Sequence, residues 1–455
     1  MTNHRKGRIS LITLWLLVAV TAWYGKNLAP WEDNRLINHD VVSYYAWLPA
    51  AWIYQDVYFD FVQSLPPDFG GRIWVHPTPA GYHAPKMTMG LALLWTPFFA
   101  VAHLAASAGM APATGYSTPY AVGIFMAALF YLFLGLWFLR KLLLEFFSDT
   151  VSALVTGLVL LATNLMYYVV SEPGMSHVYS FFLFALFLWL VHCWWDRPAW
   201  ETSFYLGLTA GLIVLVRPAN GVVLVAALLW NIRSIRSLKE RFSVLSSQWQ
   251  HLLLAAGAAL AVWIPQLLYW KVVAGEWLYY SYGEEGFFWL NPHIVKGLLS
   301  WRKGWLIYTP LMWLIFPGLV LLYRKQRGLF TPVAGFLVLH LYVTFSWWCW
   351  WYGGSYGSRP MIETYALMVF PLGAVLTWAS RQKVWIKTVL VFGLVFFTWL
   401  NQFQMRQYRT SLLHWDSMSF QAYRAIFGTL QWPENYEELI DPPDYDSALK
   451  GFPEK

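Results

Sequence analysis

The sequence contains few charged residues and almost no cysteine. Asp, Glu, Lys and Arg together make up 12% of the 455 residues, roughly half of the share that soluble globular proteins carry. The two cysteines, Cys193 and Cys349, are too few for a disulfide framework and have no metal-ligand spacing. These shortages exclude an ordinary soluble enzyme and a small disulfide-stabilised domain.

A basic surface for nucleic acid is also missing. The net charge is +7, but the Lys and Arg residues cluster in short connections between apolar runs, which is the distribution that membrane orientation produces. The sequence has no evenly spaced basic helix with stacking aromatic residues. We therefore expect membrane lipids, and no nucleic acid, among the partners of the protein.

Long apolar segments dominate what is present. Hydrophobic residues account for 58% of the chain, and they recur in runs of about 20, the length of a transmembrane helix. We predict an all-α polytopic membrane protein, with a transmembrane domain over 1–402 and a short tail over 403–455. The first helix is expected to remain uncleaved, because GKNLAPW behind it lacks a small-x-small cleavage site. About eleven transmembrane helices are expected, near 9–24, 118–139, 150–169, 178–195, 203–216, 220–231, 250–273, 305–323, 330–348, 361–380 and 386–402.

The apolar run TMGLALLWTPFFAVAHLAAS, 88–107, decides the topology. If it does not span, nearly all basic residues of the short loops fall on the same side as the basic N-terminus, whereas a span would place them opposite. We favour an apolar helix or helical pair at the outer leaflet, broken at Pro97, with a plain spanning helix as the alternative. The N-terminus is then cytoplasmic and the tail outside, as in a bacterial inner-membrane protein.

Two acids stand out in the outer loops. Asp40 begins an apolar stretch, 40–55, with helical spacing, which predicts a juxtamembrane helix with a carboxylate near its positive end. A plain helix cap is the simplest alternative. Glu172 follows the predicted helix 150–169 in the segment SEPGMSH, together with His177. Acids at such a depth usually face a cavity or a partner, whereas a neutral, packed side chain is the simpler interpretation of His177.

Basic residues near the outer ends of predicted helices form a second group. Guanidinium groups match phosphate oxygens in shape and charge. Anchoring at lipid headgroups is the alternative for each member, and it is the interpretation that we favour for Lys303. Arg217 and Arg359 differ from the others, because they are the only basic residues of the short outer loops and lie beside Pro or Gly. The members of the group are Lys86, Arg217, Arg302, Lys303 and Arg359.

The segment YSYGEEGFFWLNPHI, 280–294, carries two adjacent acids among aromatic residues. Glu284 and Glu285 cannot face the same way on a regular element. We expect one of them to form a salt bridge with Arg302 or Lys303, which is a structural role.

The order of these motifs resembles the GT-C superfamily of polytopic glycosyltransferases, which includes protein O-mannosyltransferases and the lipid A aminoarabinose transferase. Those enzymes have an acid and juxtamembrane helices in a long first outer loop, and a second acidic motif further along. Asp40 matches the first acid, YHAPKMTMGLALLWTPFF (82–99) the segment before a juxtamembrane helix, and SEPGMSH (171–177) the second motif. The likeness covers roughly residues 1–230. His39 stands where the mannosyltransferases carry the first residue of an acidic pair.

The resemblance implies a GT-C-like bundle with juxtamembrane helices in a long first periplasmic loop, 25–117. It also implies an inverting transfer of a sugar from a polyprenyl-phosphate donor. Asp40 would be the general base for the acceptor hydroxyl, and Glu172 would orient the acceptor or the sugar or help to hold a divalent metal. Cations would stabilise the leaving phosphate. The expected substrate- and phosphate-binding residues are Lys86, Arg217, Arg302, Arg359, His177 and Tyr44.

Alternatives stay open at this point for the cofactor, for the acceptor and for the function itself. Members that use lipid monophosphate sugars generally need no metal, so no cofactor is expected, whereas members that use diphosphate-linked oligosaccharides bind one. The acceptor is a glycan, a lipid or a protein. Two other functions stay open: a polytopic lipid or sugar transporter or flippase, for which internal repeats are typical, and a non-catalytic membrane assembly protein.

Overall fold

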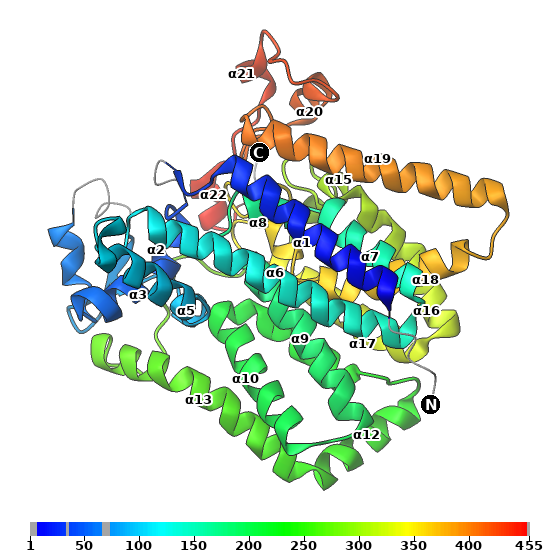
Figure 1. Cartoon of the computed structure of the whole chain (residues 1–455), viewed down its shortest axis with the longest axis horizontal. Coiled ribbons are helices and arrows are strands. Elements are labelled where there is room, and N and C mark those ends of the chain that lie inside the picture. The colour runs from blue at the N-terminus through cyan, green and yellow to red at the C-terminus, as the bar shows by residue number, and fades with distance from the viewer. Residues whose placement is uncertain (1–6, 33–35, 66–72, 453–455) are drawn as a thin grey trace.

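The computed structural model describes residues 7–32, 36–65 and 73–452, which form a bundle of helices (Figure 1). Within these residues, seven helical segments are long and apolar enough to cross a membrane. They are α1 (Arg8–Leu28), α5 with its extension (Gly90–Met110), α6 (Thr118–Phe146), α9 (His177–Asp196), α13 (Trp249–Val273), α17 (Arg327–Phe345) and α19 (Val384–Arg409). The shorter apolar helices are α7 (Asp149–Leu161), α10 (Trp200–Val216), Pro218–Leu229 and α18 (Tyr365–Ala379). The chain is thus a helical integral membrane protein, and the count of eleven spans stays a prediction.

Some segments predicted as single helices are interrupted. The segment 150–169 divides into α7 and α8 (Leu165–Val170). The segment 305–323 begins with a short helix and a 3₁₀ turn that starts at Pro310, before regular α-helix resumes. Proline lacks the N–H that a continuing helix needs, so the regular hydrogen bonds stop there. The resulting pieces are α15 (Trp305–Tyr308), the turn Pro310–Leu314 and α16 (Ile315–Lys325).

Short elements fill the connections. A two-stranded antiparallel hairpin joins β1 and β2 within the first long loop, with Val75 opposite Pro85. The remaining elements are α2 (Asp40–Tyr45), α3 (Trp47–Pro49), a π-helical turn (Ala50–Tyr54), 3₁₀ turns (Asp60–Ser64, Pro218–Val223, Arg359–Met361), β1 (Val75–Pro77), β2 (His83–Pro85), α11 (Leu224–Leu229), α12 (Ile235–Ser247), α14 (Ile294–Leu299), α20 (Phe420–Ile426), α21 (Tyr436–Leu439) and α22 (Tyr445–Leu449). The helical stretch expected from Asp40 is therefore present, in three short pieces.

The bundle has two chemically different ends. At one end, Nη2 of Arg140 donates to the backbone oxygen of Gly7 at 2.6 Å, and the ring of Phe146 lies 6.4 Å from that of Trp230. This end, which we call the basic end, gathers the start of α1, the end of α6 and the connections after α11 and α16. Figure 1 shows the N-terminus here and α2, α3 and α5 at the opposite end of α6, which we call the site end.

The helix α5 (Gly90–Ala105) runs beside one half of α6, at the site end. Its Leu94 oxygen accepts from the hydroxyl of Tyr131 at 3.0 Å, and Nδ1 of His103 lies 2.7 Å from the hydroxyl of Tyr120. The prediction that Pro97 breaks this segment is wrong, because the helix continues through it. One lost backbone hydrogen bond is outweighed by packing along α6. Whether α5 crosses the membrane stays a prediction.

Glycines bring the apolar helices α10 and α13 into close contact. A Cβ atom added to Gly207 of α10 would lie 2.1 Å from the backbone oxygen of Ala255 in α13, and one added to Gly211 would lie 2.7 Å from that of Ala259. Only a residue without a side chain permits this approach, as in other small-residue interfaces of membrane helices. The contact holds α10 in place, and the end of α10 leads directly into Arg217.

Candidate active site

A cavity of about 790 Å³ opens at the site end of the bundle. Its walls combine two kinds of side chain. Charged residues and His177 reach it from six separate segments, and many of the other lining residues are tryptophan and tyrosine residues of the loop after α13 and of the segment after α17. The lining includes the acidic, basic and histidine side chains of Asp40, Lys86, His177, Arg217, Glu285 and Arg359.

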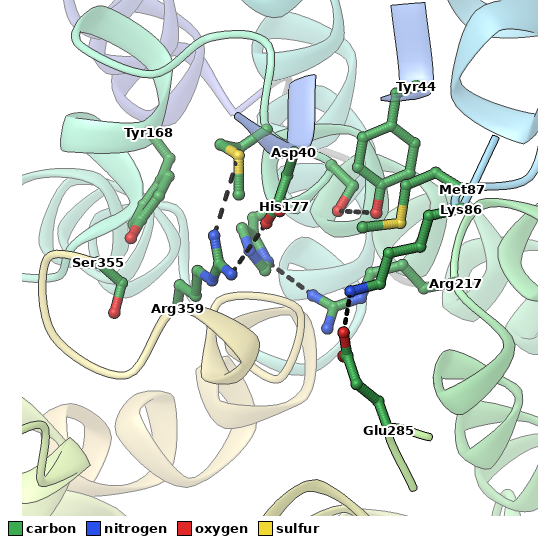
Figure 2. Close-up of polar contacts among 12 residues, drawn as sticks. Asp40, Tyr44, Lys86, Met87, Tyr168, His177, Arg217, Glu285, Ser355 and Arg359 are labelled. Carbon is green, nitrogen blue, oxygen red and sulfur yellow. Dashed lines mark hydrogen bonds and ion pairs between the residues drawn. The ribbon is translucent and has the colours of Figure 1, made fainter. Parts of the chain in front are cut away.

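Asp40 forms an ion pair with Arg359 in this lining. Nη2 of Arg359 lies 3.0 Å from Oδ2 of Asp40, and the two side chains are 16% and 24% exposed. Figure 2 shows the guanidinium directed at the carboxylate, and its Nη1 lies 4.0 Å from the sulfur of Met175. Asp40 is the first residue of α2, whose N-cap is His39, and no side chain caps that helix start. The carboxylate therefore serves the pair and not the helix end.

The pair sets the protonation state of Asp40. Burial by itself would raise the pKa of this carboxyl, but the positive charges of Arg359 and Lys86 outweigh burial and hold the pKa below its ordinary value of 3.8. Asp40 is consequently ionised at neutral pH. Its backbone neighbour His39 has a φ of 48°, a left-handed conformation that costs energy in a residue other than glycine and that turns the chain into α2.

A second group joins Arg217, His177 and Glu363. Nη1 of Arg217 lies 3.3 Å from Oε1 of Glu363, and Nδ1 of His177 lies 3.0 Å from the same oxygen. Glu363 and His177 are buried, with side chains 0% and 1% exposed. Burial would raise the pKa of Glu363, but His177 and Arg217 lower it. The interpretation of His177 as a packed histidine holds, with the addition that it contacts a charged network.

Glu363 is a site residue that sequence reasoning missed. It lies four positions after Arg359, just before α18 begins at Tyr365, and is an isolated acid at the start of an apolar helix. That isolation was the available signal. Its second oxygen, Oε2, is buried and has no hydrogen-bond partner among the described residues. A buried carboxylate oxygen without a partner is costly, so the position of Glu363 depends on the two partners of Oε1.

Lys86 forms an ion pair with Glu285, one of the two loop acids for which the sequence predicts a different basic partner. Its Nζ contacts Oε1 of Glu285, and Oε2 of Glu285 accepts from the indole of Trp348 at 3.1 Å. The prediction that Glu284 or Glu285 pairs with Arg302 or Lys303 is therefore wrong. The loop after α13 instead folds across to the first long loop, and this contact closes one side of the cavity.

Arg302 and Lys303 lie outside the cavity lining. Nη2 of Arg302 pairs with Asp441 at 3.2 Å, and its side chain is 8% exposed. Lys303 is 2% exposed and donates to the backbone oxygen of Ser355, so the expectation that it anchors at headgroups is wrong. Burial lowers the pKa of Lys303 to about 7. Both residues fasten the segment around 301–303 to the tail and to the loop before Arg359.

The other two predicted residues occupy different positions. Tyr44 lines the cavity, one helical turn after Asp40, and its hydroxyl lies 3.4 Å from that of Ser176. Glu172 does not line the cavity; its Oε1 accepts from the hydroxyl of Tyr167 at 2.7 Å. Burial raises the pKa of Glu172, and the charge of Asp40 adds to that rise. Among the described residues, no three His, Cys, Asp or Glu side chains cluster in a way that would hold a metal ion.

Solved structures provide the only similarities to known proteins. No protein-family model and no curated protein matches the sequence. The archaeal oligosaccharyltransferase AglB of Archaeoglobus fulgidus, in complex with an inhibitory peptide and a dolichol-phosphate, is 13% identical with a TM-score of 0.49, over 90% of this chain and 57% of that one. The apo form of an oligosaccharyltransferase from the same organism is 14% identical with a TM-score of 0.47, over 100% and 61%.

Both neighbours are oligosaccharyltransferases. The chain spans 57% to 61% of the length of these solved chains. At such identities and with TM-scores below 0.5, the likeness carries no argument about ligands or activity. The case for a function therefore depends on the geometry of the cavity.

Proposed function

We propose that the protein is a membrane glycosyltransferase that moves a sugar from a polyprenyl-phosphate donor to an acceptor hydroxyl, with inversion at the anomeric carbon. The observation that carries this proposal is the Asp40–Arg359 pair in the lining of a large cavity that is also lined by many aromatic side chains. The pair places a carboxylate and an anion-binding group side by side. Proton removal and phosphate departure require these two functions next to each other.

The guanidinium groups have capacity for a phosphate. In the described part of the chain, Asp40 engages only Nη2 of Arg359, and Nη1 has only the weak acceptor sulfur of Met175. Arg217 uses only Nη1 for Glu363 and His177. Each guanidinium carries five N–H donors, so both groups retain donors for phosphate oxygens. The developing negative charge on the leaving phosphate would be stabilised by these two fixed cations, with Lys86 as a third.

Donor binding would also activate the base. Asp40 is a weak base while Arg359 neutralises it, because the pair lowers its pKa. A phosphate that draws the guanidinium toward itself would weaken the pair and return the pKa of Asp40 toward its ordinary range. The acceptor hydroxyl becomes acidic as its oxygen bonds to the anomeric carbon, and a carboxylate within hydrogen-bond reach then accepts the proton. We assign this role to Asp40. Glu172, which does not line the cavity, is assigned the role of orienting the acceptor or the sugar.

The aromatic part of the lining suits the rest of the donor. Trp270, Trp347 and Tyr282 line the same cavity as the charged groups, and Nζ of Lys86 lies 5.2 Å from the ring centroid of Tyr282. Such rings stack on sugar faces and cover prenyl chains, because both ligands present C–H surfaces. Tyr44 and His177 are further proposed contacts. No metal is part of the proposal.

We place the cavity at the outer face of a bacterial inner membrane. The support is the distribution of charge, because the basic end of the bundle carries the Lys and Arg of the short connections, and such residues favour the cytoplasm. The N-terminus would then lie inside and the segment after α19 outside. A transporter or flippase would need a route between both faces, and a non-catalytic assembly protein would not need Asp40. No observation favours either alternative over transfer.

The deciding experiment uses purified full-length protein and polyprenyl-phosphate donors with labelled sugars. We expect donor-dependent release of polyprenyl phosphate, and Arg359→Gln and Arg217→Gln should weaken donor binding by about 10- to 100-fold each, the usual effect of losing a charge-assisted hydrogen bond. Arg409→Gln is the control, since Arg409 lies at the end of α19 and contacts Tyr24. Wild-type donor affinity in both cavity variants would reject the proposed phosphate site.

A further inference from the structure

A second cavity, of about 580 Å³, lies at the basic end of the bundle. It opens between the end of α6, the end of α9, the connection after α11 and the connection between α16 and α17. Trp230 and His192 form part of its wall. Its four cationic side chains come from two segments far apart in the sequence: Arg233, Arg324, Lys325 and Arg327.

Backbone contacts hold these two segments together. The N–H of Asn231 donates to the oxygen of Gly328 at 3.1 Å, and the hydroxyl of Thr331 donates to the oxygen of Ile232 at 2.7 Å. A Cβ atom added to Gly328 would lie 2.3 Å from Oδ1 of Asn231 and 3.2 Å from its Cα, so the two segments approach closely at this glycine. The rim of the cavity is therefore built, and it keeps the four cations around one opening.

The positive charge of this cavity is not neutralised within the part of the chain that the structure describes. None of the four cations forms an ion pair with a carboxylate there, and the lining residues include no Asp or Glu; an acid contacts the wall at Glu145, whose Oε2 lies 4.0 Å from Nε2 of the wall residue His192. Nε of Arg233 donates to the neutral side chain of Asn231 at 3.1 Å, and the Arg327 guanidinium lies 4.9 Å from the ring centroid of Tyr323. In the site-end cavity, by contrast, each basic side chain of the lining has a carboxylate partner.

The neighbouring helix α12 indicates where the opening lies relative to the membrane. None of its residues is buried. Even Ile235 and Phe242, on its apolar face, are 78% and 68% exposed. The rest of its surface carries three basic residues together with Glu240 and several serines, and its Arg241 donates to the backbone oxygen of Trp230, in the cavity wall. An exposed apolar face beside basic residues is typical of a helix that lies in the headgroup region. The cavity then opens at the level of the lipid headgroups.

We propose that this cavity binds the headgroup phosphate of an anionic phospholipid from the leaflet at the basic end. Basic pockets between transmembrane helices on the cytoplasmic side bind such headgroups through the same chemistry. Orientation of the protein by positive charge accounts for Lys and Arg in connections, but it does not require four of them to converge on a built cavity without an acid. The site is separate from the proposed transfer site, and its test does not depend on enzymatic activity.

The test compares two double variants of equal charge in purified full-length protein. R324Q/K325Q removes two cations of the cavity. R381Q/K383Q removes two exposed cations from the α18–α19 connection, which is not part of the lining. Native mass spectrometry with added phosphatidylglycerol or phosphatidylcholine measures lipid affinity, and thermal unfolding verifies that each variant is folded. We expect a phosphatidylglycerol affinity about 30-fold lower for R324Q/K325Q, from roughly fivefold per basic residue near a surface, and a nearly unchanged affinity for R381Q/K383Q.

Three results would overturn the proposal. Equal losses in both double variants would assign the binding to general positive charge. Equal affinity of the wild-type protein for the two lipids would show that the anionic headgroup is not recognised. Displacement of the lipid by inorganic phosphate would identify a soluble phosphate as the ligand. If R324Q/K325Q fails to fold, the single variant Arg327→Gln replaces it, with an expected loss of several-fold judged by the same criteria.

Discussion

Asp40→Asn is the most informative change that the structure suggests. Asn keeps the size of the side chain and its hydrogen-bonding capacity but removes the negative charge and the ability to accept a proton. If Asp40 is the base, turnover should fall by about 10²- to 10⁴-fold. Donor binding should fall less, because Arg359, relieved of its partner at 3.0 Å, remains available to the phosphate.

The same change should cost some stability, and the size follows from the burial of the pair. Exposed ion pairs contribute about 0–1 kcal/mol, whereas breaking a fully buried pair costs about 3–5 kcal/mol. With side chains 24% and 16% exposed, the pair lies between these limits, so we expect a loss of about 1–3 kcal/mol. As the pKa of Asp40 is lowered in the fold, the contribution of the pair is present above pH 3.8 and disappears as the pH falls through the lower folded value.

The assay follows the release of polyprenyl phosphate from a labelled donor by purified protein, next to thermal unfolding of each variant. Asp60→Asn is the matched control, because Asp60 is an exposed acid of the same loop, at the start of a 3₁₀ turn and outside the cavity lining. Turnover of the Asp40→Asn protein within about threefold of wild type, at a stability that leaves it folded, would refute Asp40 as base. The base would then have to be sought at Glu172, or the function in one of the non-enzymatic alternatives.

Three further results are expected. Glu363→Gln should raise KM for the donor by about tenfold with a smaller change in kcat, because loss of this carboxylate releases Arg217 and not the base; a fall in kcat alone would contradict the positioning role. Gly207→Ala should destabilise the protein by about 1–3 kcal/mol through overpacking against α13, whereas Gly257→Ala, with open space around its Cβ position, should be neutral or stabilising by unfolding measurements. A cysteine at Met110 should react with an impermeant thiol reagent added outside cells and a cysteine at Ser237 should not; the reverse pattern would invert the proposed topology.

Local sequence patterns were sufficient for the class of the protein and for most of its helices. Length and composition of the apolar runs predict helices at positions where α6, α9, α13, α17 and α19 are found, because a membrane-spanning helix satisfies its own backbone and needs no partner to be recognised. The same reasoning fails at Pro97, where propensity predicts a break and packing along α6 maintains the helix. It fails again after Leu161, where a predicted single helix is interrupted.

Sequence patterns thus indicate a helical membrane protein with Asp40 and a few cations as candidates on one side, whereas the folding of the whole chain selects which charges meet. Asp40 and Arg359 are 319 positions apart, and Lys86 and Glu285 are 199 apart. Glu363 drew no attention as a lone acid, yet it organises Arg217 and His177. Coulomb attraction depends on the distance between groups and on their desolvation. Neither quantity is encoded locally, because both arise only when loops from opposite ends of the chain close over the same cavity.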